Sequence, residues 1–200
     1  MVATSKAALR AQLLLARRRV TRDLHTAEAG LLKEHVRHVV TAGSTVCAYA
    51  PVGTEPGSTE MLDVLLDSAI RVLLPVARTG PDSVPLPLRW SQYQPHRLAS
   101  APFGLLEPPE PWLPATALAQ ASLVLVPALA VDSRGVRLGR GRGFYDRSLV
   151  HANPQALLIA VVRDEELVDE LPAEPHDVAM THALTPQRGV VALPLSSATT

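Results

Sequence analysis

Three apolar runs constrain the fold of this chain more than any other feature. RVLLPVA at 71–77, LVLVPALAV at 123–131 and ALLIAVV at 156–162 contain almost no polar side chain. A strand with one face in water alternates apolar and polar residues, whereas a strand covered on both faces is apolar throughout. Because parallel strands need crossover connections, which helices usually provide, these runs predict a parallel sheet with helices on both faces.

Segments with helical or strand-like patterns alternate with these runs. A helix is expected from about Thr21 to Val40, with an inward face formed by Leu24, Leu31, Leu32, Val36 and Val39. The other expected elements are a strand at Thr45–Val52, a helix at Ser58–Ile70, a short strand in PLPLRW at 85–90 within a proline-rich loop over 78–116, a helix from about Phe144, and strands near 178–185 and 189–193. The order predicts an α/β fold: a single domain over residues 1–200, with a mostly parallel sheet flanked by helices in a Rossmann-like three-layer arrangement.

The composition excludes several classes of function. Basic residues (Lys and Arg) and acidic residues (Asp and Glu) both number 19, which argues against a dedicated nucleic-acid binder with a strong global field. The longest apolar stretch, 121–131, is interrupted by Pro127 and is too short to span a bilayer. The single cysteine, Cys47, excludes an internal disulfide and fits a reducing compartment. We therefore expect a cytoplasmic protein that contacts neither nucleic acid nor membrane, and we expect it to be a monomer.

The N-terminal segment allows three interpretations. Residues 1–22 contain several basic side chains and no acidic one, which is typical of a mitochondrial transit peptide. Apolar residues at helical spacing also predict an amphipathic helix over the same segment. Lys6, Arg10 and Arg17 would share one face of that helix. This basic face is either solvated or directed at a bound anion. The apolar positions of the helix are Leu9, Leu13 and Ala16.

The segment RLGRGRGFYDRSL at 137–149 places three glycines among arginines. Like charges at this density repel one another unless an anion lies among them. The segment is expected to follow a buried strand and lead into a helix, where backbone N–H groups and the helix dipole favour a phosphate group. Neither a Gly-Lys-Ser/Thr phosphate loop nor a G-x-G-x-x-G dinucleotide pattern is present. An exposed arginine-rich turn and an RNA-binding segment are the alternatives.

Three aspartates accompany this loop. Asp132 ends the preceding apolar run, Asp146 follows the glycines, and Asp177 begins a later strand region. A magnesium ion that bridges nucleotide phosphates needs only one or two carboxylates and water. Asp146 would stay ionised beside the arginines, although a carboxylate in a first helical turn is also common without a metal. Tyr145 is a candidate for stacking on a ligand, for donating a hydrogen bond, or simply for packing in the core.

Several motifs in a fixed order resemble one known family. VPALAVDSRGVRLGRGRGFYDRSL at 126–149 is similar to the signature of the 5-formyltetrahydrofolate cyclo-ligase family. Lys6-x-x-Leu-Arg10 resembles that family's N-terminal phosphate-binding helix, and Glu55 matches its substrate glutamate in position. FGLLEP at 103–108 and PAEPHDVAMTHALT at 172–185 are similar to two further family segments.

The resemblance implies an enzyme that uses ATP and Mg²⁺ to convert 5-formyltetrahydrofolate into 5,10-methenyltetrahydrofolate, with release of ADP and phosphate. The implied ATP-binding residues are Lys6, Arg10, Arg137, Gly139, Arg140, Gly141, Arg142, Gly143, Phe144 and Tyr145. The implied catalytic residues are Tyr145 and Arg142, the folate-binding residues are Glu55, Phe103, Gly104 and Glu107, and the metal ligands are Asp146 and Asp177. Departures from the family pattern are Ala128, Val131 and Phe144. Because Phe144 replaces a tyrosine, the catalytic hydroxyl is assigned to Tyr145. A non-catalytic nucleotide- or folate-binding protein on the same fold is the alternative.

Overall fold

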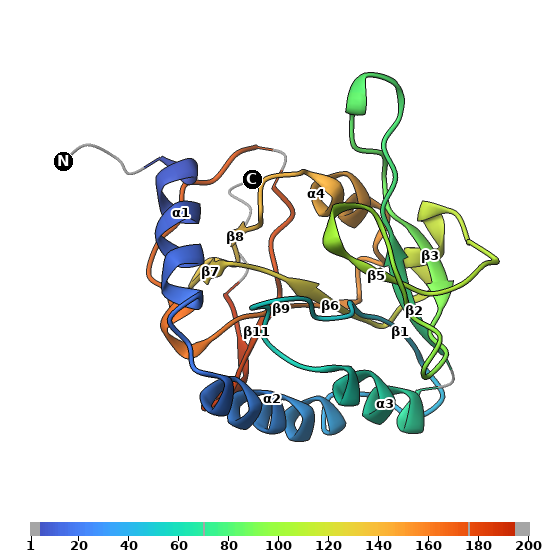
Figure 1. Cartoon of the computed structure of the whole chain (residues 1–200), viewed down its shortest axis with the longest axis horizontal. Coiled ribbons are helices and arrows are strands. Elements are labelled where there is room, and N and C mark those ends of the chain that lie inside the picture. The colour runs from blue at the N-terminus through green and yellow to red at the C-terminus, as the bar shows by residue number, and fades with distance from the viewer. Residues whose placement is uncertain (1–4, 70, 176, 195–200) are drawn as a thin grey trace.

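The computed structural model describes residues 5–69, 71–175 and 177–194, and Figure 1 shows its layered arrangement. The helices are α1 (Lys6–Arg17), α2 (Arg22–Arg37), α3 (Thr59–Ser68) and α4 (Phe144–Ser148). The strands are β1 (Thr45–Cys47), β2 (Arg71–Val76), β3 (Arg89–Gln92), β4 (Ala99–Ser100), β5 (Leu106–Glu107), β6 (Leu123–Pro127), β7 (Ala130–Asp132), β8 (Arg137–Leu138), β9 (Leu157–Val161), β10 (Leu167–Val168), β11 (His182–Thr185) and β12 (Gly189–Ala192). The 3₁₀ helices are Pro81–Ser83, Pro102–Gly104, Ala115–Gln120, Leu149–His151 and Asp164–Glu166.

The main sheet contains seven strands within the described residues, in the order β12-β11-β9-β6-β1-β2-β3. Its five central strands are parallel, because β1 pairs with β2 and β6, and β9 pairs with β6 and β11. The edge strands β3 and β12 run antiparallel to their neighbours. The prediction of a mostly parallel α/β sheet is therefore confirmed. Since β1 lies between β2 and β6, the strand order reverses at β1, where open α/β sheets bind their ligands.

Both faces of this sheet are covered, as the apolar runs predicted. Alternate strand residues belong to two separate buried clusters, because successive side chains point to opposite faces. One cluster packs against α2 and α3, which lie together below the sheet in Figure 1, through Leu32, Val36, Met61 and Leu65. The opposite cluster packs against α4 and two 3₁₀ helices through Leu118, Phe144 and Leu149. Cys47 is buried in this second cluster, as expected for a strand thiol.

The apolar run 123–131 forms two strands rather than one. β6 ends at Pro127, whose nitrogen carries no hydrogen for a strand ladder. Beyond Ala128 the chain leaves the main sheet, and the Leu129 N–H donates to the Leu138 carbonyl at 2.7 Å. The next strand, β7, belongs to a small sheet with β8 and β10, against which α1 packs through Leu9 and Leu13. The arginine–glycine loop thus follows this small sheet, and not a strand of the main sheet as expected.

Several elements predicted from the sequence are shorter in the structure, and some side chains predicted to face inward are exposed. The strand expected at Thr45–Val52 ends at Cys47, although Ala48–Ala50 remains buried. The helix expected from about Thr21 to Val40 is α2, which ends at Arg37. Its residues Leu24 and Leu31 are exposed rather than inward-facing. Helical spacing alone could not predict this, since only part of the apolar stripe is covered by the sheet. The helix expected at Ser58–Ile70 is α3 (Thr59–Ser68), and Ile70 lies outside the described residues.

The proline-rich segment 78–116 is mostly loop, as expected, but it contains three short strands. PLPLRW contributes only its last residues to β3, which begins at Arg89. β4 and β5 pair with each other as a separate two-stranded sheet. The strand expected near 178–185 begins at His182, and β12 follows as predicted. Among the described residues, no helix has the length and apolar character needed to cross a membrane.

Candidate active site

A cavity of about 560 Å³ lies at the carboxyl ends of β1, β2 and β6. Residues that follow β1 form one wall, and the loop between β8 and α4 forms another. α1, which stands beside β7 and β8 in Figure 1, adds a third wall through Lys6, Arg10 and Leu14. The cavity therefore lies where the strand order reverses, and segments far apart in sequence meet there.

The arginine–glycine loop forms the part of the cavity wall between β8 and α4. Gly141 and Gly143 have φ angles of +88° and +74°, a left-handed conformation that residues with a side chain rarely adopt. Arg10 of α1 donates from Nε to the Gly139 carbonyl at 2.9 Å, so α1 and the loop are directly joined. The helix that follows, α4, has only five residues, so a large dipole contribution from it is not expected.

Two of the expected phosphate-binding cations are paired with the two expected metal ligands. Lys6 Nζ lies 3.2 Å from Asp177 Oδ2 and 3.0 Å from Glu174 Oε1. Burial lowers the pKa of Lys6, but hydrogen bonds and attraction from these two carboxylates outweigh it and raise the pKa above the usual lysine value. Arg137 pairs with Asp146 through Nη2 and Oδ1. The cavity thus holds two ion pairs. A bound anion could replace the carboxylate as the partner of each basic side chain, and a bound cation could replace the basic side chain as the partner of each carboxylate.

Glu55 lies on the opposite wall, and Arg140 of the loop pairs with it. Arg140 Nε is 3.1 Å from Glu55 Oε1, while the Val52 N–H donates to Oε2 at 3.0 Å. Burial raises the pKa of Glu55 above the usual glutamate value. The charges of Arg140 and Arg17 and the Val52 hydrogen bond oppose this rise. Glu55 is therefore a desolvated acceptor whose ionisation depends on the neighbouring loop.

Tyr145 contributes a buried hydroxyl with no hydrogen-bond partner in the described part of the chain. A buried polar group without a partner is costly, and such groups often belong to ligand sites. Burial, followed by the nearby charge of Glu55, raises the pKa of Tyr145 well above the usual tyrosine value, although Arg137 opposes the shift. The hydroxyl therefore keeps its proton near neutral pH. It can exchange hydrogen bonds with a ligand, but it cannot act as a base.

Two phenylalanine rings in a tilted arrangement and an arginine lie together at the cavity. Arg142 places its guanidinium 4.5 Å from the ring centroid of Phe103, and the Phe103 and Phe144 rings are 5.3 Å apart. Phe103 and Gly104 both have positive φ, at +66° and +73°. Within the described residues Arg142 forms no ion pair, in contrast to Arg137 and Arg140. In that part of the chain its charge therefore has no carboxylate partner.

The structure brings almost all of the sequence-predicted site residues to this one cavity. Those that line it are Lys6, Arg10, Glu55, Phe103, Gly104, Arg137, Gly139, Arg140, Gly141, Arg142, Gly143, Phe144, Tyr145, Asp146 and Asp177. Glu107 is not among the lining residues. Its Oε1 accepts from the Ala77 N–H at 2.7 Å and its Oε2 from Arg78 at 2.8 Å, so it supports the end of β2.

Asp132 does not belong to the site either. Its carboxylate is fully buried and accepts hydrogen bonds from the backbone N–H groups of Arg134, Val136 and Leu171. It also pairs with the Arg134 side chain at 3.1 Å. These contacts hold the turn between β7 and β8, so Asp132 adds nothing to the metal-binding hypothesis.

The carboxylates that remain on the cavity wall are the residues that could hold a magnesium ion. Among the described residues there is no group of three or more His, Cys, Asp or Glu side chains arranged to hold a metal. A site made only of protein ligands is thus not present in that part of the chain. Mg²⁺ commonly uses one or two carboxylates and completes its shell with water and phosphate oxygens. Asp146 and Asp177, on a cavity that also carries the glycine loop, meet this requirement.

Among the cavity residues that sequence reasoning did not assign to the site, Tyr49 and Arg17 carry polar groups. Tyr49 follows β1 and is almost completely buried, with its hydroxyl donating to the Pro56 carbonyl at 2.7 Å. Its place just after a parallel strand was the available signal. Arg17 was noted only as part of a basic helix face, yet it lies buried at the cavity. Helical spacing put Arg17, but not the exposed Arg18, on the face of Lys6 and Arg10, yet spacing alone did not show that Arg17 would be buried.

The sequence model of one family matches residues 2–186, which is nearly the whole chain: the 5-formyltetrahydrofolate cyclo-ligase family. This chain belongs to that family. A 5-formyltetrahydrofolate cyclo-ligase of Mycolicibacterium smegmatis is 58% identical over 189 residues, covering 94% of this chain and 97% of the relative. An Escherichia coli member of the cyclo-ligase family is 35% identical over 74 residues, covering 36% of this chain and 40% of its own length. The recognition from the sequence motifs is confirmed.

Two solved structures share the fold of this cyclo-ligase family member. The NMR structure of the Aquifex aeolicus 5,10-methenyltetrahydrofolate synthetase matches with a TM-score of 0.71 and 23% identity, covering 94% of this chain and 92% of that one. The synthetase of Mycoplasma pneumoniae matches with a TM-score of 0.67 and 19% identity, covering 88% and 96%. At this identity the likeness supports the fold, and the roles of individual cavity residues remain predictions.

Proposed function

We propose that this protein uses ATP to close the ring of 5-formyltetrahydrofolate, giving 5,10-methenyltetrahydrofolate, ADP and phosphate. The observation that carries the proposal is a single cavity, in a cyclo-ligase family member, with the arginine–glycine loop on one wall and Glu55 on another. The loop and α1 supply positive charge for a nucleotide. Glu55 supplies a desolvated acceptor for the N–H donors of a pterin ring.

The first chemical step is transfer of the terminal phosphoryl group. The formyl oxygen of the folate bonds to the γ-phosphorus, the bond from that phosphorus to the bridging oxygen breaks, and ADP leaves. Such transfers depend on in-line positioning and charge neutralisation more than on covalent chemistry by the protein. Lys6, Arg10 and Arg142 supply the positive charge in this proposal, together with backbone N–H groups of the loop.

The second step closes the ring. N10 of the folate attacks the activated formyl carbon, the carbon–oxygen bond breaks, phosphate leaves, and N10 loses its proton. The protonated Tyr145 hydroxyl, which has no partner in the described chain, is suited to hydrogen-bond the oxygen that changes charge in these steps. Arg142, whose guanidinium lies over the ring of Phe103, is suited to neutralise the departing phosphate.

Asp146 and Asp177 would hold a magnesium ion together with the nucleotide. When bound, the ion supplies charge neutralisation for the phosphate oxygens. The pairs Lys6–Asp177 and Arg137–Asp146 hold these carboxylates in place in the free protein. On nucleotide binding, each cation is expected to turn from its carboxylate towards the phosphates.

The proposal is tested by mixing the protein with 5-formyltetrahydrofolate, Mg²⁺ and ATP. Appearance of the methenyl chromophore, with one phosphate released per product, is the expected result. Binding of both ligands without phosphate release would instead favour the non-catalytic alternative. Absence of binding to either ligand would defeat both.

We further propose that the enzyme acts as a cytoplasmic monomer without nucleic-acid or membrane partners, which its single buried thiol and balanced charge support.

Asp146→Ala should lower turnover by about tenfold or more, as loss of a metal ligand or its support typically does. Raising the Mg²⁺ concentration should recover part of that loss, because weaker metal affinity is compensated by mass action. The measurement is initial rate against Mg²⁺ concentration. Asp67→Ala, which removes an exposed carboxylate from α3, is the matched control. Normal Mg²⁺ dependence in Asp146→Ala would remove its assignment as a ligand.

Tyr145→Phe should lower kcat by roughly tenfold or more, since removing one hydrogen-bond donor to a developing charge has an effect of this order or larger. The same change should leave the folded protein as stable as before, or more stable by about 1 kcal/mol, because the hydroxyl it removes is buried and has no partner among the described residues. Steady-state kinetics and urea unfolding measure the two effects. Unchanged kinetics would leave Tyr145 with a packing role only.

Glu55→Gln should weaken folate binding and leave ATP binding nearly unchanged, because Arg140 is the one expected ATP-binding residue that is ion-paired with Glu55 in the described chain, and several other cations line the cavity. In the wild type, folate affinity should fall as the pH drops through the pKa of Glu55, since the folate needs the ionised carboxylate. That fall should occur above the usual glutamate range, because burial raises this pKa. Arg140→Ala should move this fall in folate affinity to still higher pH, because the charge of Arg140 opposes the rise in the pKa of Glu55.

Calorimetric titrations at a series of pH values provide the measurement for Glu55. Glu55→Gln should also abolish the acidic fall, since glutamine does not ionise. Loss of ATP affinity with folate affinity preserved would overturn the assigned division between the two walls. If the folate affinity of Arg140→Ala falls at the same pH as that of the wild type, the Arg140–Glu55 pair does not influence the ionisation of Glu55.

A further inference from the structure

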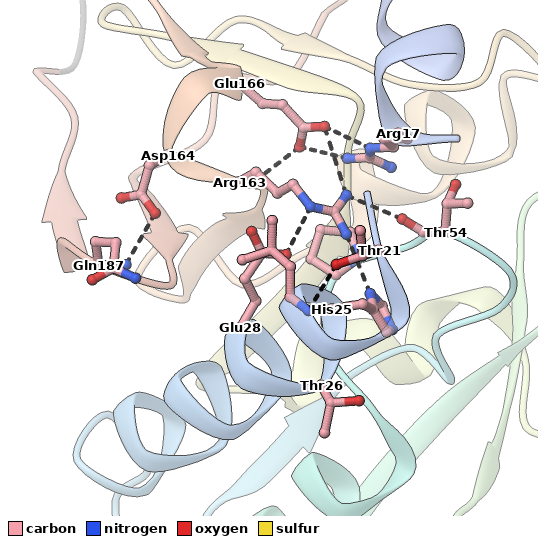
Figure 2. A network of polar contacts seen from close by, with 12 residues as sticks. Arg17, Thr21, His25, Thr26, Glu28, Thr54, Arg163, Asp164, Glu166 and Gln187 are labelled. Atoms are coloured by element: carbon pink, nitrogen blue, oxygen red, sulfur yellow. Dashed lines mark hydrogen bonds and ion pairs between the residues drawn. The ribbon is translucent and has the colours of Figure 1, made fainter. Parts of the chain in front are cut away.

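Four buried charged side chains meet beside the cavity, and the proposed reaction assigns no role to them. They come from the end of α1, from α2, and from the segment after β9, and they are Arg17, Glu28, Arg163 and Glu166 (Figure 2). The side chains of Arg17 and Arg163 are each only 1% exposed. Burying ionised groups is costly unless they are closely paired, and apolar residues often replace such pairs without loss of stability. Their presence therefore calls for a role beyond packing.

Glu166 joins the two arginines. Its Oε1 accepts from Arg17 Nε at 2.6 Å and its Oε2 accepts from Arg17 Nη2 at 2.7 Å, which is a two-point pairing of fixed orientation. The same Oε2 accepts from the backbone N–H of Arg163 at 2.8 Å. One carboxylate thus fixes both the Arg17 side chain and the point where the Arg163 side chain begins.

Arg17 fixes α1 against the main sheet. Its Nη2 also donates to the Ala128 carbonyl, at the position where the chain leaves β6. α1 carries Lys6 and Arg10, which line the cavity. The orientation of α1, and with it the placement of these two cations, therefore depends on Arg17.

Arg163 fixes the opposite wall. Its Nε donates to Glu28 at 2.8 Å, its Nη2 lies 3.2 Å from His25 Nδ1, and its Nη1 donates to the Thr54 carbonyl at 3.2 Å. Thr54 immediately precedes Glu55, and Figure 2 shows its carbonyl facing the Arg163 guanidinium. The backbone that presents Glu55 to the cavity is therefore held by Arg163.

We propose that Arg17, Glu166 and Arg163 are positioning residues that set the two walls of the cavity relative to each other. Arg17 places the nucleotide-binding helix, Arg163 places the loop that bears Glu55, and Glu166 couples them. This inference rests on the proposed function, because it assumes that the α1 side binds ATP and the Glu55 side binds the folate. A purely structural network would affect stability, but it would not separate the two ligands.

The test compares variants that keep the charge but lose the forked guanidinium. Arg17→Lys should weaken ATP binding by about tenfold and change folate binding little, since hydrogen bonds to charged groups contribute about this much. Arg163→Lys should show the reverse, with the folate constant raised and the ATP constant unchanged. Glu166→Gln should weaken both. Arg18→Lys, at the exposed neighbour of Arg17, is the control and should change neither.

Dissociation constants for each ligand alone are measured by calorimetry on the full chain, with circular dichroism to verify folding. Wild-type protein that binds neither ligand would refute the proposed function. Wild-type binding with unchanged constants in folded Arg17→Lys and Arg163→Lys would refute the positioning inference alone, as would equal losses for both ligands in each variant. If either lysine variant fails to fold, Glu28→Gln takes its place. This variant must then raise the dissociation constant for the folate and leave that for ATP unchanged. Failure of every variant to fold would assign the network to stability and overturn the inference.

Discussion

Replacing Lys6 and Arg10 together with alanine is expected to raise the dissociation constant for ATP by roughly a hundredfold. Both side chains line the cavity, where they are partly shielded from water. A hydrogen bond that involves a charged group contributes about 1.5–3 kcal/mol, and each 1.4 kcal/mol is one decade of affinity. Each single variant should therefore show about a tenfold loss. Arg10→Ala should also loosen the loop, because Arg10 bonds to the Gly139 carbonyl.

Three comparisons make this expectation specific. Folate affinity measured without ATP should barely change in the double variant, because Glu55 and its wall are untouched. Arg19→Ala removes an equal charge from an exposed position and should leave both constants as they are. Circular dichroism should show an intact fold. An ATP constant equal to that of the wild type would return the N-terminal segment to its other interpretations, a targeting address or a solvated basic face.

The main features of the fold could be predicted because they follow from local patterns. Uninterrupted apolar runs at 71–77 and 156–162 belong to strands buried on both faces, so their parallel pairing followed from the pattern. The break at Pro127 could have been predicted from the missing N–H, but the continuous hydrophobicity of 123–131 concealed it. Exposure of Leu24 and Leu31 could not be predicted, since it depends on how far the sheet extends beneath α2.

The outline of the candidate site could be predicted from the sequence for a different reason. The glycines at 141 and 143 have the left-handed backbone that makes glycine necessary, so the loop was visible in the sequence. Which charges are buried was not visible. Arg17 and Glu166 are 149 residues apart, and no local pattern links them. Glu107 shows the opposite case: a motif predicted it as a folate-binding residue, and in the structure its oxygens bond to Ala77 and Arg78 while it is not among the cavity-lining residues.

Glu166→Ala is expected to lower the free energy of unfolding by about 3–5 kcal/mol, the range for removing one partner of a buried ion pair. Arg17 would lose both of its carboxylate contacts, and the Arg163 N–H would lose its acceptor. Domains of this kind are stable by only about 5–15 kcal/mol, so the urea midpoint should fall markedly. Glu165→Ala, at the exposed neighbouring position, should stay within about 0.5 kcal/mol of the wild type.

The double variant Arg17→Met with Glu166→Met separates the cost of an unpaired charge from the value of the pair. Because replacing a whole buried pair by apolar side chains is often neutral or stabilising, this variant should be more stable than Glu166→Ala despite two changes. If the network exists to place α1, the double variant should nevertheless bind ATP about tenfold more weakly than the wild type. Restored stability with weakened ATP binding would show that the buried charges serve the cavity and not the fold. Restored stability with normal ATP binding would show that apolar packing positions α1 equally well.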